Sequence, residues 1–172
     1  MSGIVLYKSK YGATKQYAGW IAGETGFDCM EIDKAKMEDI KQYDTIIFGG
    51  GVYASGISGL SFLKKNISQF EGKKVVVFCV GASPYDEKAF DELVARNMKD
   101  SLADLPCFYC RGAFDMDAMT FVDRNLCRML QKSIAKKNPE EWEVWEKALM
   151  EAGNGKCDWT DKSFIDQILD IL

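Results

Sequence analysis

Residues 4–14 read Ile-Val-Leu-Tyr-Lys-Ser-Lys-Tyr-Gly-Ala-Thr, and this stretch decides the fold. Its first part, Ile4 to Tyr7, is apolar without alternation, which is typical of a strand buried on both faces. A turn with a glycine and two hydroxyl groups follows, and apolar residues then recur at helical spacing from Tyr17 onward. A strand, a tight turn and a helix in this order indicate an α/β unit.

The same alternation continues along the chain. Short, β-branched apolar runs at Thr45 to Phe48 and Val75 to Val80 predict two more buried strands, and weaker strands are expected at Phe27 to Ile32 and Cys107 to Ala113. Helical patterns separate these runs, with a short helix expected at Met37 to Lys41. Five strands joined by crossover helices predict a doubly wound parallel sheet. In such a sheet the ligand site lies at the carboxyl ends of the strands.

Length and charge limit the choice of function. A chain of 172 residues has room for one ordinary domain, so we expect a single domain over residues 1–172. Its 26 acidic and 22 basic residues give a net charge of −4, so there is no overall positive field to attract nucleic acid or anionic lipid. No run of residues approaches the length of a transmembrane helix, and the N-terminus does not have the pattern of a signal peptide.

The chain has no histidine, which excludes an imidazole base, a histidine metal ligand and a Ser-His-Asp triad. Its six cysteines are scattered through apolar or helical surroundings rather than set in a short disulfide framework. We therefore expect a reducing, cytoplasmic location. Cys107 and Cys110 form a CxxC, but residues three apart in a strand point to opposite faces, which favours packing over a redox or metal site.

A long segment, Phe114 to Asp158, shows no strand pattern and exceeds the usual connection of roughly 2 to 6 residues in α/β units. One amphipathic helix is expected at Val122 to Ile134. A second helix is expected to begin with Asn138 as its N-cap and to end at Gly153. The sequence thus predicts a helical insertion over about 114–158, followed by a last helix with apolar residues from Phe164 to Leu169.

The turn after the first strand has the residues of a phosphate cradle. Free N–H groups at a helix N-terminus, with the hydroxyls of Ser9 and Thr14, suit a phosphate, and Gly12 lets the backbone come close to its oxygens. The alternative is structural, with Thr14 as the helix N-cap and Gly12 as a turn residue. Neither the P-loop pattern GxxxxGK[ST] nor GxGxxG is present here.

The third and fourth strands end in loops that combine small residues with one tyrosine. These loops read Gly49-Gly-Gly-Val-Tyr-Ala-Ser-Gly56 and Gly81-Ala-Ser-Pro-Tyr-Asp86. Small residues allow a flat ring to lie against bare backbone, and an aromatic side chain can stack on its face. The structural alternatives are a flexible turn and a helix start with Ser83 as N-cap and Pro84 at N1. The three loops together favour a planar heterocycle attached to a phosphate.

On these three loops the sequence resembles the flavodoxin family, with S-K-Y-G-A-T after the first strand, G-G-G-V-Y after the third and V-G-A-S-P-Y after the fourth. The resemblance implies a sheet of strand order 2-1-3-4-5 and FMN as the cofactor. It also implies that a carbonyl near Gly50 or Gly51 accepts a hydrogen bond from N5 of the reduced flavin. The cofactor-binding residues that it implies on the phosphate are Ser9, Lys10, Tyr11, Gly12, Ala13 and Thr14. Those that it implies around the ring system are Gly50, Gly51, Val52, Tyr53, Ala54, Gly81, Ala82, Ser83, Pro84, Tyr85 and Asp86.

The chain also departs from flavodoxins. Flavodoxins usually carry a further hydroxyl where Tyr11 stands, are more acidic, and lack a helical insertion of this size. Lys10 has two interpretations, a positive charge near the phosphate or a side chain in solvent. Tyr53 and Tyr85 are assigned as stacking residues by position only, and either can instead be a rim residue.

The insertion resembles a narrower group, flavodoxin-domain oxidoreductases similar to the quinone-linked, oxygen-independent protoporphyrinogen dehydrogenase. The similarity lies in Gly112-Ala113 at the end of the fifth strand, in the long helical segment, and in Asp158-Trp-Thr-Asp161 before the last helix.

Charge is divided within the insertion. Residues 120–138 carry five basic residues and one acidic residue, a net of +4, whereas residues 139–152 carry five glutamates and one lysine, a net of −4. Arg124, Arg128, Lys132 and Lys136 recur every four residues. The functional interpretation is a docking surface for an acidic partner, a carboxylated tetrapyrrole or an anionic membrane. The structural interpretation is two helices that pair their opposite charges. Core packing is expected for Trp142 and Trp145.

Three functions follow from these observations. The first is an FMN-binding oxidoreductase or electron-transfer protein that passes one or two electrons between a redox partner or small reduced substrate and an acceptor. The second is an enzyme that oxidises a porphyrinogen-like substrate, with the insertion as its substrate or quinone dock. The third is a flavodoxin-like binding module without FMN. No metal site and no oligomeric state is indicated, and a peripheral membrane contact stays open.

Overall fold

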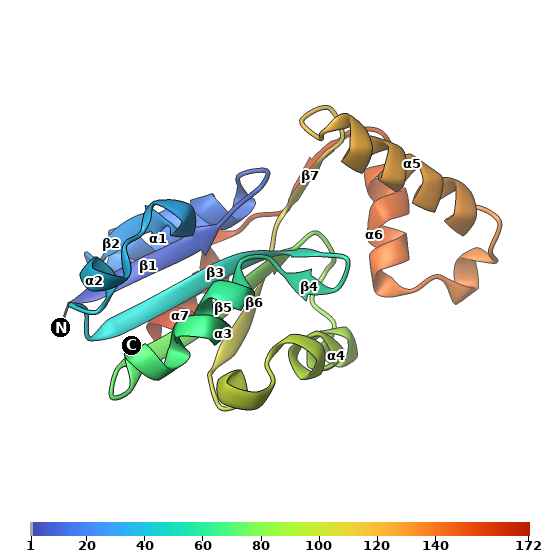
Figure 1. Cartoon of the computed structure of the whole chain (residues 1–172). Helices are drawn as coiled ribbons and strands as arrows, with labels where there is room; N and C mark the ends of the chain where they lie inside the picture. Colours follow the sequence, from blue (N-terminus) through green and yellow to red (C-terminus); the bar gives the residue numbers. More distant parts are fainter. Residues whose placement is uncertain (1) are drawn as a thin grey trace.

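The protein has an α/β fold, in which helices flank a central sheet and a helical arm lies at one end (Figure 1). A computed structural model describes residues 2–172. Five parallel strands lie in the order β2-β1-β3-β5-β6, which confirms the predicted order of the parallel strands. They are β1 (Gly3–Lys8), β2 (Asp28–Glu31), β3 (Thr45–Tyr53), β5 (Lys74–Gly81) and β6 (Cys107–Arg111).

Helices cover both faces of this sheet. One face packs against α1 (Ala13–Thr25) and, near the C-terminus, η5 (Lys162–Ile165) and α7 (Asp166–Leu169). The other face is covered by η1 (Ile32–Lys34), α2 (Met37–Ile40), α3 (Leu60–Asn66), η2 (Ile67–Phe70), α4 (Glu87–Asn97) and η3 (Asp100–Leu102). Within residues 2–172, no helix has the length and apolar character needed to cross a membrane.

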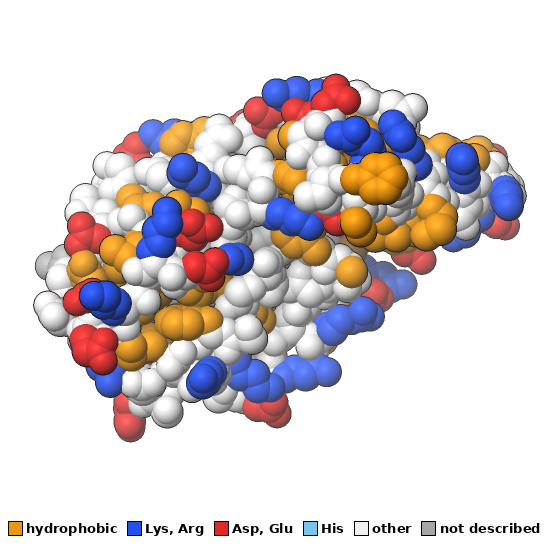
Figure 2. Space-filling view, turned by 45° about the horizontal axis from the view of Figure 1, so that its top comes forward, with side chains coloured by type: hydrophobic (Ala, Val, Ile, Leu, Met, Phe, Trp, Pro, Cys, Tyr) orange, Lys and Arg blue, Asp and Glu red, His pale blue; other side chains and the backbone are white. Residues whose placement is uncertain are grey.

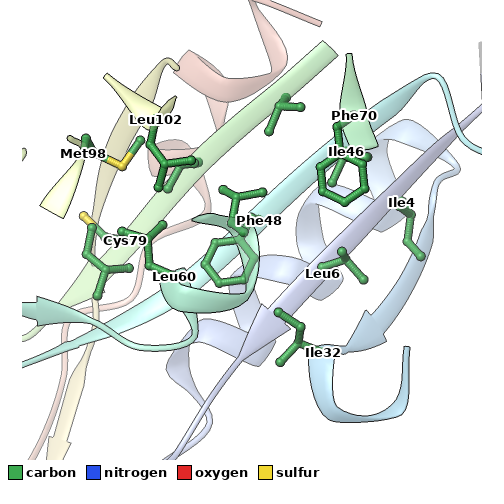
Figure 3. Close-up of a cluster of buried hydrophobic side chains, with 14 of the residues drawn as sticks. Ile4, Leu6, Ile32, Ile46, Phe48, Leu60, Phe70, Cys79, Met98 and Leu102 are labelled. Atoms are coloured by element: carbon green, nitrogen blue, oxygen red, sulfur yellow. The ribbon is translucent and has the colours of Figure 1, made fainter. Parts of the chain in front are cut away.

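The central strands are buried on both sides, as their apolar runs predict. Alternate residues of β3 enter different clusters, so that Ile46 and Phe48 pack on one face and Ile47 on the other. Figure 3 shows the first of these clusters, in which Phe48, Cys79 and Leu60 meet between the sheet and α3. Since both faces are filled, the edge formed by the carboxyl ends of the strands is the part of the sheet left for a ligand.

Residues 113–158, which we call the arm, extend from the end of β6 away from the sheet (Figure 1). Two short antiparallel strands form its base, and α5 packs against α6 beyond them. Its elements are β7 (Ala113–Asp115), α5 (Phe121–Ile134), η4 (Pro139–Glu141), α6 (Val144–Ala152) and β8 (Lys156–Asp158). The expectation that this segment contains no strand is therefore wrong.

Two details of the arm also differ from prediction. The helix expected from Asn138 is split, because Asn138 caps only the 3₁₀ turn η4, and the chain is extended at Trp142 before α6 begins. The indole of Trp142 donates to the carbonyl of Ile134 at 3.2 Å, and the carboxylate of Glu146 accepts the N–H of Glu143, which starts α6 as a new helix. Trp145 is 42% exposed, so the expected core packing of this residue is wrong.

Other boundaries are corrected outside the arm. The predicted strand Cys107 to Ala113 is interrupted at Gly112, whose N–H donates to the carbonyl of Gly81 at 2.7 Å. The last helix begins as the 3₁₀ turn η5, because the side chain of Asp161 accepts the N–H of Ser163 at 2.8 Å. These shifts leave the strand order and the edge of the sheet unchanged.

Candidate functional site

The first loop, Ser9 to Gly12, connects β1 to α1 and leaves the start of that helix open. Gly12 is the N-cap with φ 103°, a left-handed conformation that favours glycine, and no side chain caps the helix. The Ser9 hydroxyl instead accepts the N–H of Gly12 at 3.1 Å. Because the first N–H groups of an α-helix have no partner within the helix, this N-terminus is suited to an anion.

Thr14 is the second residue of α1, and its side chain is buried. The alternative in which Thr14 caps the helix is therefore wrong, because Gly12 occupies that position. A Cβ placed on Gly12 would meet no atom within 4 Å, so the glycine is required here by its φ angle and not by crowding within the chain. Ala13, the first residue of α1, lies beside the end of β6, since a Cβ on Gly112 would be 3.5 Å from the Cβ of Ala13.

Lys10 and Tyr11 turn toward the arm. The ammonium of Lys10 and the hydroxyl of Tyr11 both donate to the carboxylate of Asp123 in the first turn of α5. The Tyr11 hydroxyl also accepts the N–H of Thr120 at 3.3 Å, and the Thr120 side chain caps α5. Lys10 is exposed, in keeping with the interpretation that its side chain lies in solvent, and it also forms an ion pair with Asp123, 113 residues away in the sequence. The bond from Lys10 holds the pKa of Asp123 below its usual value.

The third loop is a hairpin and not an irregular turn. β3 continues to Tyr53 and reverses at Ala54 and Ser55 into β4 (Gly56–Ile57), which pairs with it in the antiparallel direction. Gly50, Gly51, Val52 and Tyr53 therefore lie in the extended end of β3, and Ala54 is in the turn. The carbonyl of Gly51 accepts the N–H of Ser58 at 2.8 Å.

The hairpin turn is strained and is held by a neighbouring helix. Ala54 and Ser55 have φ angles of 47° and 64°, which non-glycine residues rarely adopt. Asn97 at the end of α4 donates to the carbonyl of Ser55 at 2.9 Å and accepts the N–H of Ile57 at 3.1 Å. Backbone strain of this kind is found at functional sites, where the surrounding structure maintains it.

The Tyr53 ring folds back over its own strand. A Cβ on Gly51 would lie 2.8 Å from the ring, so the ring covers bare glycine backbone. The ammonium of Lys10 is 6.0 Å from the centre of the Tyr53 ring, which places the first and third loops side by side. Burial raises the pKa of the Tyr53 hydroxyl, although 41% of the residue is exposed.

The fourth loop, Gly81 to Asp86, is fixed from beneath by the end of β6. The hydroxyl of Tyr109 donates to the carbonyl of Ser83 at 2.6 Å, and Nε of Arg111 donates to the carbonyl of Ala82 at 3.2 Å. A Cβ on Gly81 would lie 2.7 Å from the Tyr109 hydroxyl, so this position requires glycine. These contacts fix the direction of the loop carbonyls.

Pro84, Tyr85 and Asp86 complete this loop. Tyr85 is 56% exposed, with its ring centre 6.1 Å from that of Tyr109. The start of α4 differs from prediction, because Asp86, and not Ser83, is its N-cap and accepts the N–H of Ala89 at 2.9 Å. The carbonyl of Ser83 instead accepts the hydroxyl of Tyr109, and the helix begins three residues later at the side-chain cap that Asp86 provides.

Arg111 is a polar residue of this edge that the motifs do not reveal. Its guanidinium lies over the Trp159 ring at 4.3 Å, and its Nη2 is buried with no hydrogen-bond partner in residues 2–172. Tyr17 fixes the same strand end, since its hydroxyl donates to the Arg111 carbonyl at 2.5 Å. A buried guanidinium nitrogen without a partner is costly, and an acceptor on a bound molecule would remove that cost.

The CxxC has the two-sided arrangement that its spacing predicts. Cys110 is buried on the face covered by α1, whereas Cys107 packs on the opposite face. Burial raises the pKa of the Cys110 thiol to about 12, so this group stays a neutral thiol at ordinary pH. The structure supports a packing role for this pair.

Two comparisons of the sequence with known proteins return matches. A family model described as a flavodoxin domain matches residues 4–141, well over half of the chain. An uncharacterized protein of Methanocaldococcus jannaschii is 33% identical over 116 residues, which is 65% of this chain and 76% of that protein.

Solved structures resemble the fold at lower identity. A flavodoxin, WrbA-like protein from Agrobacterium tumefaciens has 20% identity and a TM-score of 0.46, over 72% of this chain and 87% of the other. A flavodoxin from the domain Archaea has 18% identity and a TM-score of 0.43, over 75% and 92%. The two-electron reduced flavodoxin of Megasphaera elsdenii has 16% identity and a TM-score of 0.44, over 62% and 82%.

Proposed function

The chain belongs to the flavodoxin-domain family, and from that premise we propose that it binds FMN and passes one or two electrons between a reduced donor and an acceptor. FMN supplies the redox chemistry when it is bound, and the protein binds it, orients it and limits its contact with water. The residues that we propose for the site are the three loops predicted from the sequence, 9–14, 50–54 and 81–86.

The observation that carries this proposal is the open N-terminus of α1. A 13-residue helix begins at Ala13, after the N-cap Gly12, without a side-chain cap, one short loop after β1 and beside two hydroxyl residues. The other helices of at least eight residues begin with a side-chain cap or a capping box, α4 at Asp86, α5 at Thr120 and α6 at Glu143, whereas the seven-residue α3 also starts at an uncapped glycine. An uncapped helix start at the carboxyl edge of a parallel sheet suits the phosphate of FMN.

The other two loops fit a flat ring system. The bare backbone of Gly51 lies under a tyrosine ring, and Tyr85 is exposed beside the fourth loop. We propose that Tyr53 and Tyr85 lie along the faces or rim of the ring system. The unpartnered Nη2 of Arg111 adds a donor at this edge, which fits a cofactor with several carbonyl oxygens.

The first test is a titration of the purified protein with FMN, followed by visible absorbance and flavin fluorescence. Thr14→Val keeps the shape of the side chain and removes its hydroxyl, so we expect FMN to bind about tenfold more weakly. Ser101→Ala removes an exposed hydroxyl on η3, far along the chain from the loop, and serves as the matched control with unchanged affinity. Equal affinity in Thr14→Val and Ser101→Ala would refute the phosphate assignment.

Gly12→Val separates conformation from chemistry in the same loop. Gly12 has a φ of 103°, which is strained for valine, so we expect the loop to distort and FMN to bind more weakly. If the native protein, without any substitution, fails to bind FMN, the third predicted function, a flavodoxin-like binding module, replaces the electron-transfer proposal.

A second candidate function is an enzyme that oxidises a porphyrinogen-like substrate and passes the electrons to a quinone. The arm favours it, because Asp123 of α5 contacts the first loop directly and places the arm beside the proposed flavin. Under anaerobic conditions, a reduced porphyrinogen should bleach the flavin absorbance of the FMN-loaded protein. If only reduced redox proteins bleach it, the first function stands alone.

We also propose a cytoplasmic location. All six cysteines are free thiols in the structure, which is the usual state in a reducing compartment. Fractionation of cells that express the native chain tests this assignment.

A further inference from the structure

The outer face of α5 exposes large apolar side chains. Phe121 is 78% exposed, Val122 is 72% and Met129 is 62% exposed, and Leu126 is 47% exposed. Val122, Leu126 and Met129 are four and three residues apart, so they share one face of the helix. Exposed apolar groups gathered in this way mark a protein or membrane contact.

The opposite face of α5 is occupied by α6. The amide of Gln131 donates to the carbonyls of Leu149 and Gly153, at 3.2 and 2.7 Å. Ile134 is buried on this inner side. The glutamates of η4 and α6 therefore lie behind α5, and the apolar row has no cover within residues 2–172.

Basic side chains lie on the flank of α5 between the apolar row and α6. Arg128 and Lys132 are exposed and, with Gln131, Ala135 and Asn154, line an open groove of about 460 Å³. Figure 2 shows hydrophobic and Lys or Arg side chains side by side along the arm. Arg124 is not part of this surface, because its guanidinium donates to the carbonyls of Met116 and Met119.

Within residues 2–172, the basic residues of α5 form no ion pair with the glutamates behind them. The arm has an ion pair between Lys137, which follows α5, and Glu146, and another between Lys156 and Asp115. The α5 residue that forms an ion pair is Asp123, with Lys10. Arg128 and Lys132 form no ion pair within residues 2–172. The expected pairing of opposite charges between the two helices therefore does not include Arg128 and Lys132.

We propose that the outer face of α5 docks on an anionic membrane surface, with the helix lying in the plane of the interface. Its apolar row would enter the boundary between headgroups and acyl chains, while Arg128 and Lys132 bind lipid phosphates. An acidic protein partner is less well matched, because the apolar side chains project along a convex helix and do not line a pocket. The residues of this docking surface are separate from those of the proposed FMN site.

Vesicle flotation of the full chain tests the proposal. We expect binding to vesicles of phosphatidylcholine with about a third phosphatidylglycerol, weaker binding to phosphatidylcholine alone, and release by salt. Val122→Glu with Met129→Glu should abolish binding, and Arg128→Glu with Lys132→Glu should weaken it by about tenfold or more. All four positions are exposed, so the variants should fold, which circular dichroism checks.

The matched control changes two exposed cations away from the arm. Lys88→Glu with Arg96→Glu on α4 alters the net charge equally, and we expect it to leave vesicle binding unchanged. An equal loss in this control would refute a specific surface on α5. Absence of vesicle binding would also overturn the proposal, as would binding of polyglutamate but not vesicles, which would assign the face to an acidic protein.

Discussion

The sheet and the arm use apolar side chains in opposite ways. In the sheet, Phe48 and Phe78 are fully buried, and β1, β3 and β5 fill both faces. In the arm, a small cluster of Phe114, Met116 and Ala152 is buried at the base, whereas α5 exposes its largest apolar residues. The sheet uses its apolar surface for folding, and the arm keeps part of its apolar surface for another molecule.

The largest expected contrast between the two regions is in stability. Phe78→Ala removes a fully buried ring from the sheet and should lower the free energy of unfolding by about 3–5 kcal/mol. Met129→Ala removes an exposed side chain from the arm and should change it by less than about 0.5 kcal/mol. Urea unfolding of both variants measures this difference. Similar losses in both would show that the α5 face is part of a folded core.

The next largest contrast in stability is expected between alanine substitutions at two glycines of the sheet region. A Cβ on Gly49 would overlap the Phe78 ring, so Gly49→Ala should cost about 1–3 kcal/mol through overpacking. A Cβ on Gly19 in α1 would meet no atom within 4 Å, so Gly19→Ala should stabilise the protein by about 0.5–1 kcal/mol. Thermal melts measure both effects, since we expect Gly49→Ala to lower the melting temperature and Gly19→Ala to raise it. A stabilising Gly49→Ala would contradict this description of the core.

The junction between sheet and arm gives the next effect. Asp123→Asn removes a carboxylate beside the proposed phosphate loop and leaves Lys10 free of its partner. We expect FMN to bind more tightly, by up to about tenfold or 1.4 kcal/mol at low salt. Hydrogen exchange should also become faster in residues 9–12, with urea unfolding little changed. Weaker FMN binding in Asp123→Asn would show that Asp123 organises the loop for the cofactor.

The smallest expected effect is a local pH dependence in the arm. Lys137 donates to the buried carboxylate of Glu146 at 2.5 Å and lowers its pKa below the ordinary value of 4.5, as does the Glu143 N–H. The stabilisation is therefore complete above pH 4.5 and is lost as the pH falls through the lower pKa of the folded state. Over that range the protection of the α6 amides, measured as hydrogen exchange relative to the intrinsic rate at each pH, should fall in the native chain. Glu146→Gln should exchange faster already at pH 6 and show less pH dependence, and an identical profile would contradict this assignment.

The sheet could be predicted because its pattern is local. Apolar runs and helical periodicity gave the order of elements, and the parallel order followed from the family resemblance. The hairpin turn at Ala54 and Ser55 could not be predicted from the sequence, since neither residue is typical of a turn with two positive φ angles. The site residues themselves stay predictions, as does the assignment of one domain with an insertion.

The neighbours of the proposed site depend on long-range packing. Asp123 approaches the first loop because the start of α5 lies beside that loop, and Asn97 holds the hairpin from the end of α4. Arg111 adjoins the fourth loop because β6 pairs with β5. No spacing in the sequence brings these residues to the loops. The +4 charge of residues 120–138 was the one sequence feature that indicated a docking surface on the helix expected there, which is α5.

The bonds from Lys10 and Tyr11 to Asp123 join two surfaces that would otherwise be independent. Any ligand of the first loop that displaces Asp123 changes the freedom of α5, and any molecule that restrains α5 changes the loop. Thermodynamic linkage requires the two effects to be equal, so a given factor in one affinity appears as the same factor in the other. The pKa of Lys10 is raised and that of Asp123 is lowered, so the ion pair that couples the two surfaces stays charged across the neutral range of pH.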